Sequence, residues 1–421
     1  MKTFLTCVAA LLLVQASYAY LPSSNEDYYR VVMLNGSEIP PIKGKEIGEI
    51  SLFAVADGVL EPVPFQIDEY NIGGGVYFED WHEEIDGTLG IIDENDKILA
   101  LYGDSGPRRK PFMRADGKIV AEIELLTRHG EKRYFYVVEG SRLEAEAQHV
   151  RHSIEASHVE TDFFSLTYEK ENQLIWKDFS FADYQGDSPI DGLKIAMETG
   201  ILSSGANVSY DNENFIAKTV AENVGPIRTT AQLHLTFVLL GLDFIEVSVQ
   251  LHFYPNALIY DVRLIMPETR RAMLVNPVLT MTLDFNNLYG ARGITDALDE
   301  HVIVDGVMSD LERKVNELTL NSEHNGLVLK TDKGFNVATF MNWIEERDSI
   351  TSIYYLDDPE YSNKVDRFKG RLPDAGYRVT ELPEDGLLGF VASIYFSDKF
   401  EGKPEALSHY LRVAPDIKVN F

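Results

Sequence analysis

Two neighbouring stretches of this chain alternate between apolar and polar residues, and this alternation constrains the fold more than any other feature. Over 227–237 the odd-numbered positions are apolar, apart from one threonine, whereas the even-numbered positions are polar. Over 245–253 the same alternation recurs, again with apolar residues at odd-numbered positions. A period of two residues is that of a β-strand with one buried and one polar face. The pattern therefore predicts two long strands of an antiparallel sheet.

A turn near Leu240-Gly241 would pair these two strands antiparallel. The predicted cross-strand partners are Thr230 with His252, Gln232 with Gln250, His234 with Ser248, and Thr236 with Glu246. Partners in an antiparallel pair project from the same face of the sheet. We therefore expect the polar side chains of both strands to converge on one surface.

This polar face carries the strongest candidates for chemistry. Arg228 could pair with an acidic sugar, and a histidine near a carboxylate could move a proton. The candidate proton-transfer residues are His234, His252 and Glu246, and the candidate ligand-binding residues are Arg228, Gln232, Gln250 and Tyr254. Antiparallel sheets commonly expose one face to water, so a solvated face with no further role is the alternative.

The remainder of the chain also reads as strands. Short β-rich runs fill 28–138, and longer runs fill 162–397, with a polar seam at 141–157 between them. About 400 residues exceed what one hydrophobic core usually holds. The sequence therefore predicts an all-β protein of two antiparallel β-sandwich domains with little helix. Residues 20–150 would form the smaller sandwich, and residues 151–421 the larger, long-stranded one.

The N-terminus has the features of a signal peptide. Lys2 precedes a short apolar core at 4–14, and Ser17-Tyr18-Ala19 supplies a cleavage signal, so we expect residues 1–19 to be removed. The single cysteine, Cys7, leaves with this segment. Disulfides and cysteine-ligated zinc are then excluded in the mature chain. An exported protein without cysteine fits a bacterial periplasm or the cell exterior.

The net charge of −29 restricts the possible partners. Such a surface repels nucleic acid and anionic membranes. The most apolar stretch after the signal, 233–253, contains Asp243 and Glu246, so no membrane span is expected.

A second candidate site is the acidic segment Asp93-Glu94-Asn95-Asp96. Clustered carboxylates on a loop suit calcium, and Asp93, Glu94 and Asp96 are the expected ligands. The alternative is an ordinary turn, in which aspartate side chains accept hydrogen bonds from the nearby backbone.

Two groups of short motifs resemble known families. The segment 63–69, followed by Gly87-Thr88-Leu89 and 93–98, resembles the start of a group of exported, poorly characterised prokaryotic β-proteins. The segment Asn223-Val224-Gly225-Pro226-Ile227-Arg228 is similar to the start of a strand in galactose-mutarotase-like sandwich domains. Those domains occur in carbohydrate epimerases and polysaccharide lyases. The resemblance implies a mutarotase-like supersandwich and a carbohydrate ligand, without matching a catalytic residue.

These observations lead to one expected function and one alternative. We expect an exported, carbohydrate-engaging protein that uses the polar sheet face for glycan binding, with a lyase- or epimerase-like activity as its catalytic form. The alternative is a non-catalytic structural or assembly component of the cell envelope. No cofactor other than calcium is expected.

Overall fold

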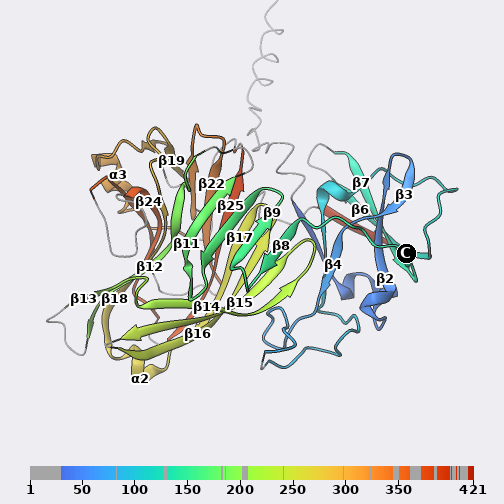
Figure 1. The fold of residues 1–421 in the computed structure, drawn as a ribbon, viewed down its shortest axis with the longest axis horizontal. Helices are drawn as coiled ribbons and strands as arrows, with labels where there is room; N and C mark the ends of the chain where they lie inside the picture. The colour runs from blue at the N-terminus through green and yellow to red at the C-terminus, as the bar shows by residue number, and fades with distance from the viewer. Residues whose placement is uncertain are drawn as a thin grey trace, which may run out of the picture.

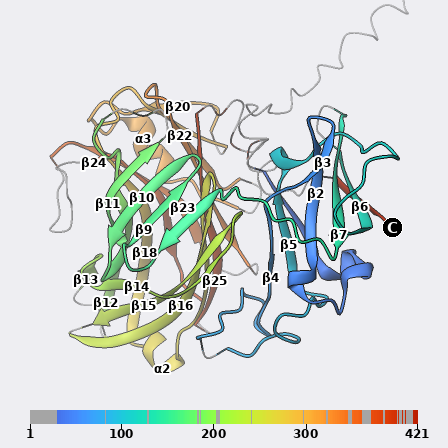
Figure 2. The same cartoon turned by 45° about the vertical axis from the view of Figure 1, so that its right-hand side comes forward.

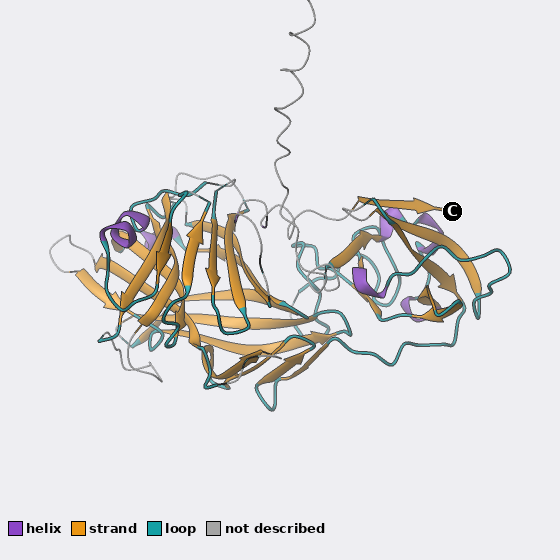
Figure 3. Ribbon diagram, turned by 90° about the horizontal axis from the view of Figure 1, so that it is seen from above, coloured by secondary structure: helices purple, strands orange, loops and turns teal. Residues whose placement is uncertain are grey.

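The computed structural model describes residues 30–421, with gaps at 82, 127–129, 182–183, 185, 202–206, 240, 297, 322–323, 345–349, 361–370, 384–385, 399, 401–403, 405–406 and 408–415. The predicted signal peptide at 1–19 lies outside the described residues. Antiparallel strands are the main secondary structure of the described chain, and loops connect them (Figure 3). The predicted all-β fold with little helix is confirmed.

The larger body is a sandwich of two nine-stranded sheets (Figure 1). The first sheet contains, in spatial order, β23 (Ile350–Asp358), β24 (Arg371–Thr380), β18 (Leu274–Phe285), β12 (Ile190–Ile201), β11 (Asn172–Phe181), β10 (Phe164–Glu169), β9 (His158–Thr161) and β8 (Val150–Ser153), with β13 (Asn207–Tyr210) paired to β12. The second sheet contains β14 (Phe215–Val224), β15 (Thr229–Leu239), β16 (Leu242–Tyr254), β17 (Ala257–Ile265), β25 (Leu387–Ser397), β22 (Asn336–Trp343), β21 (Gly326–Lys330), β19 (Arg292–Thr295) and β20 (His301–Ile303).

The two strands predicted from the alternating pattern are β15 and β16, and their register is the expected one. Thr230 pairs with His252, Gln232 with Gln250, His234 with Ser248, and Thr236 with Glu246. The odd-numbered residues of both strands face the first sheet and contribute Leu233, Phe237, Val249 and Leu251 to the large core. The even-numbered residues form the outer face of the second sheet.

The smaller body contains two further sheets around their own core. A three-stranded sheet has the order β1 (Val31–Asn35), β5 (Lys97–Leu101) and β4 (Phe65–Asp68). A five-stranded sheet has the order β26 (Asp416–Asn420), β6 (Lys118–Leu126), β7 (Lys132–Glu139), β2 (Ile50–Ala56) and β3 (Val59–Pro62). Side chains from both sheets meet in one apolar cluster that includes Leu34, Ile98, Ile123 and Phe135.

The last strand of the chain belongs to the smaller body. Strand β26 pairs antiparallel with β6, from Asp416 opposite Leu126 to Asn420 opposite Glu122, and the C-terminus lies beside β6 (Figure 2). The chain therefore crosses from the smaller body to the larger one and back again. The domain ranges predicted from the sequence placed all of residues 151–421 in the larger sandwich.

Helices are few and short in the described residues. Those whose bounds are fully described are α2 (Glu268–Arg271), α3 (Asp310–Val315) and four 3₁₀ turns, η1 (Gly36–Glu38), η2 (Pro40–Ile42), η3 (Ile47–Glu49) and η4 (Tyr102–Asp104). Helix α3 begins with a capping box, in which Ser309 Oγ accepts a hydrogen bond from the Glu312 amide and Glu312 accepts one from the Ser309 amide. Among the described residues, a helix of the length and hydropathy needed to cross a membrane is absent.

Candidate functional site

The outer face of the second sheet is covered along part of its length by the smaller body. An apolar cluster joins Leu99 and Leu101 of β5 to Ile227, Tyr254 and Ala257 of the larger body. The segment that follows β4 continues over this face, where Tyr70 contacts Arg228, just before β15, and Val76 contacts Gln250 of β16. The polar face is therefore divided into a covered half and an exposed half, which period-two alternation alone could not foresee.

Arg228 lies in the covered half and is only 2 % exposed. Its guanidinium forms an ion pair with Asp68, donating from Nε to Oδ2 at 3.1 Å, and it also donates to the hydroxyl of Tyr254 at 2.9 Å. The backbone amides of Ile227 and Arg228 donate to Gln66 Oε1 at 2.9 and 2.7 Å. Arg228 and Tyr254, both expected to bind ligand, thus hold the two bodies together.

His252 also lies in the covered half, at 9 % exposure. Its Nδ1 is 2.9 Å from the hydroxyl oxygen of Thr230. Burial lowers the pKa of His252 well below its usual value, and the positive charges of Arg228 and Arg263 act in the same direction. The imidazole is therefore neutral at physiological pH.

The other two proton-transfer candidates are at the uncovered end of the face. Glu246 is exposed and His234 is half-buried. Glu246 and His234 are diagonal neighbours in the strand register, about 7 Å apart at the backbone. Glu246 and His252 are six residues apart on β16, which corresponds to about 20 Å. The structure therefore does not bring His234, Glu246 and His252 into one constellation.

A polar pocket of about 180 Å³ lies where the covering segment meets the exposed half. We call it the junction pocket, and its lining residues are Asn71, Gly73, Gly75, Glu83, Gln232, Ser248, Gln250, Asp261 and Arg263. Gln232 and Gln250 were predicted as ligand-binding residues, and both lie here. Sequence reasoning missed the acidic, basic and amide groups that complete the pocket.

Gln250 fastens the covering segment to the sheet. Its amide group brackets the backbone of Val76, accepting from the Val76 amide at 2.8 Å and donating to the Val76 carbonyl at 2.8 Å. A Cβ atom at Gly75 would lie 2.8 Å from Gln250 Nε2, so glycine permits this close approach. Gln250 therefore positions the wall of the pocket, since both polar ends of its amide are engaged.

Asp261 and Arg263 form the opposite wall. Arg263 donates from Nε and Nη2 to the two carboxylate oxygens of Asp261, at 3.1 Å each, and from Nη1 to the carbonyl of Gly73 at 2.6 Å. Asp261 stands directly opposite Gln250 in the register of β16 and β17. A fork-to-fork pair of this kind fixes the orientation of both groups.

Gln232 is the most unusual residue of the junction pocket. Its side chain is 1 % exposed, and its Oε1 has no hydrogen-bond partner among the described residues. Its Nε2 makes only long contacts, at 3.4 Å to the Leu233 carbonyl and 3.5 Å to the Val249 carbonyl. A buried acceptor without a donor costs about 1–3 kcal/mol. A hydroxyl or amine donor entering the pocket would relieve that cost.

The missed residues differ in whether the sequence could have revealed them. Asp261 and Arg263 alternate with apolar residues along 260–264, so extending the polar face to the next strand would have found them. Asn71 and Glu83 lie in an irregular segment, where Asn71 Nδ2 donates to Glu83. No periodic pattern marks such residues.

The acidic segment at Asp93–Asp96 forms a self-capped turn. Asp93 Oδ1 accepts from the amide of Asn95 at 2.9 Å, and Asp96 Oδ2 accepts from the amide of Asp93 at 2.8 Å. Glu94 forms an ion pair with Lys43. In the described part of the chain, a group of three or more His, Cys, Asp or Glu side chains arranged to hold a metal ion is absent. Calcium binding at Asp93, Glu94 and Asp96 stays a prediction.

The fold and the junction pocket together define an all-β protein of two joined bodies with a polar pocket at their contact. No family model and no curated protein matches the chain. Among solved structures, it is similar to an alpha-mannosidase from Enterococcus faecalis V583 (TM-score 0.46, 11% identity, covering 93% of this chain and 44% of that one). It is also similar to a glycosyl hydrolase family 38 protein from Enterococcus faecalis (TM-score 0.42, 11% identity, 94% and 43%). A bacterial glucoamylase complexed with acarbose is a more distant neighbour (TM-score 0.32, 11% identity, 82% and 37%). The chain spans less than half the length of each of these proteins.

Proposed function

We propose that the protein is an exported carbohydrate-binding protein and that the junction pocket holds the sugar. The observation that carries this proposal is the buried, unpartnered Oε1 of Gln232 at the pocket wall. The carboxylates of Glu83 and Asp261 offer further acceptors beside it. Sugar hydroxyls are donors that suit such acceptors, and a few convergent polar groups are typical of ligand sites.

The charges of the pocket favour a neutral sugar over an acidic one. Glu83 and Asp261 contribute two carboxylates, and Arg263 is already paired with Asp261. Arg228, first expected to neutralise a sugar acid, is paired with Asp68 outside this pocket. An anionic sugar would meet net negative charge at these walls, so we propose a neutral glycan.

Binding receives more support than proton transfer. A general acid or base must be within hydrogen-bond reach of the atom that it serves. Glu246 and His252 are separated by about 20 Å along β16, and the imidazole of His252 is engaged with Thr230.

The substitution Gln232→Met tests the proposal. Methionine has a similar shape and removes the unpartnered amide, so we expect unchanged or slightly higher thermal stability. We also expect at least a fivefold loss of affinity for a neutral oligosaccharide, measured by titration calorimetry on the mature protein after a glycan-array screen.

The matched control is Gln173→Met, a second buried glutamine of the larger body. Gln173 contacts the Tyr260 hydroxyl at 3.4 Å and lies outside the junction pocket. This variant should keep the wild-type affinity. Equal affinity of wild type and Gln232→Met, or binding of acidic glycans alone, would refute the proposed site.

A further inference from the structure

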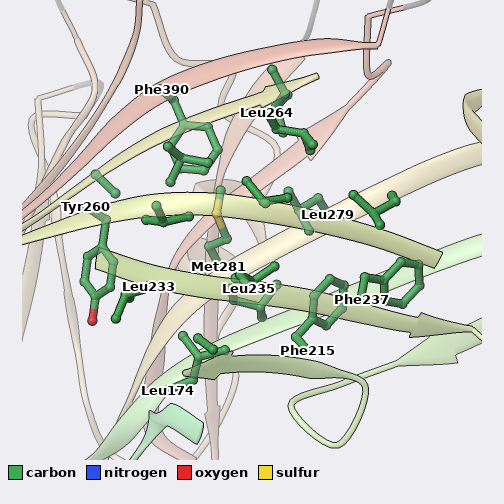
Figure 4. Close-up of a pocket in the computed structure, with 18 of the residues that line it drawn as sticks. Leu174, Phe215, Leu233, Leu235, Phe237, Tyr260, Leu264, Leu279, Met281 and Phe390 are labelled. Atoms are coloured by element: carbon green, nitrogen blue, oxygen red, sulfur yellow. The ribbon is translucent and has the colours of Figure 1, made fainter. Parts of the chain in front are cut away.

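The interior of the larger sandwich contains a second pocket, lined by apolar side chains and Tyr260. It has a volume of about 110 Å³ and lies between the two sheets. Figure 4 shows Leu233, Leu235 and Phe237 of β15 and Leu279 and Met281 of β18 around this space. The hydroxyl of Tyr260, which also lines this space, is hydrogen-bonded to the side chain of Gln173. We call this space the sandwich cavity.

Several residues that line the sandwich cavity are only partly buried although they face the core. The half-buried members of the lining are Leu193, Ile195, Leu235, Val262, Leu264 and Ala392. Inward-facing residues of a closed sandwich are normally fully buried, because the inner faces of the two sheets interdigitate. The partial burial of these six residues indicates that their side chains line open space instead of interdigitating across the sandwich.

An apolar cavity of this kind is a poor site for water. A buried water molecule needs two to four polar partners, and apolar cavities remain dry but bind apolar molecules. A cavity of about 150 Å³ lined by Leu, Ile and Phe accommodates benzene. The sandwich cavity has a comparable volume and an equally apolar lining, so it can take a hydrocarbon group of similar size.

The lining extends both across and along the strands, with residues of β14, β15, β16, β17 and β25 on the side of the second sheet. Tyr260, Val262, Leu264 and Met266 line it at alternate positions of β17 and the residue that follows the strand. Six residues of strand span about 20 Å. A volume of about 110 Å³ spread over a lining of this extent forms a thin space between the sheets, and a thin apolar space fits an extended alkyl chain better than a compact ring.

We propose that the sandwich cavity binds the hydrocarbon chain of an amphiphile, as a site separate from the junction pocket. The chain could belong to a fatty acid or to a neutral lipid, and both present the same apolar group to the lining. The test uses octanoate for the acidic source and 1-octanol for the neutral one, with binding measured by calorimetry and by the shift in melting temperature of the full mature chain.

The substitution Ala392→Leu is designed to fill the sandwich cavity. Ala392 is half-buried at its wall, so the added atoms can enter the open space. We expect wild type to bind one or both probes with a rise in melting temperature, and Ala392→Leu to bind at least tenfold more weakly. Ile265→Ala, an exposed position on the outer face of β17, is the control and should bind as wild type does.

The two probes distinguish an acidic from a neutral amphiphile. Binding of octanoate alone identifies an acidic amphiphile, and binding of 1-octanol identifies a neutral one; either supports the proposal when Ala392→Leu loses it. If Ala392→Leu does not fold, Leu235→Phe replaces it at the same cavity. The proposal is overturned if wild type binds neither probe, or if a folded, cavity-filled variant binds both with wild-type affinity.

Discussion

At the scale of single residues, the candidate site depends on which polar atoms are engaged and which are not. Gln232 of β15 and Gln250 of β16 are directly opposite each other and have the same side chain. Both polar atoms of the Gln250 amide are hydrogen-bonded to the backbone of Val76, whereas Gln232 Oε1 has no partner in the described residues. Sequence reasoning placed both on the polar face but could not separate their roles, because the difference arises from a segment about 170 residues earlier in the chain.

His149 is a residue whose environment gives a pH-dependent stability. Burial lowers the pKa of His149, but hydrogen bonds to Asp104 and Asp162 outweigh burial and raise the pKa to about 9. Asp104 is in the smaller body, and Asp162 is in the larger one. The unfolded histidine has a pKa of about 6.5. Because the folded pKa is the higher one, this contribution to stability is complete below about pH 6.5 and is lost as the pH rises through 9.

We therefore expect the melting temperature of wild type to fall between pH 6.5 and pH 9 through this residue. His149→Gln should be less stable than wild type at pH 6, and the difference should shrink towards pH 9. His158→Gln, in which the lost contact is to Thr167, is the control and should keep the wild-type pH profile. A pH-independent difference between His149→Gln and wild type would contradict a charged His149.

At the scale of elements, the alternating pattern was sufficient to predict β15 and β16 and the register between them. Such a pattern reports which face of a strand is apolar, and register follows when both apolar faces must meet one core. It does not report what covers the polar face. Arg228 and Tyr254 were expected to bind ligand for that reason, and the ion pair with Asp68 became visible only when β4 was placed against the second sheet.

The buried pair between Asp68 and Arg228 gives a prediction about the contact between β4 and β15. Arg228→Ala would leave the Asp68 carboxylate buried without its partner, so we expect a loss of about 3–5 kcal/mol in the free energy of unfolding. Urea unfolding measures this value. Arg263→Ala, whose ion pair is partly exposed, should cost at most about 1 kcal/mol. An Arg228→Ala variant with wild-type stability but without glycan binding would instead favour a direct ligand role for Arg228.

At the scale of the whole molecule, the two bodies form one unit through contacts distant in sequence. The ion pair of Asp68 with Arg228, the histidine bridge from Asp104 to Asp162, and the clamp of Gln250 on Val76 all cross the contact. Strand β26 follows the larger body in the chain and pairs with β6 of the smaller body, so the polypeptide itself also connects the two bodies a second time. Composition and strand spacing predicted two β-rich bodies, but they carry no information on how the bodies meet. The junction pocket exists only because of that meeting.

Hydrogen–deuterium exchange of the protein tests whether a neutral glycan binds in the junction pocket. With a neutral oligosaccharide bound, we expect slower exchange at 71–84 and along 248–263, and no such change in the Gln232→Met variant. Protection confined to other parts of the chain, or no protection by any neutral glycan under saturating conditions, would contradict glycan binding in the junction pocket.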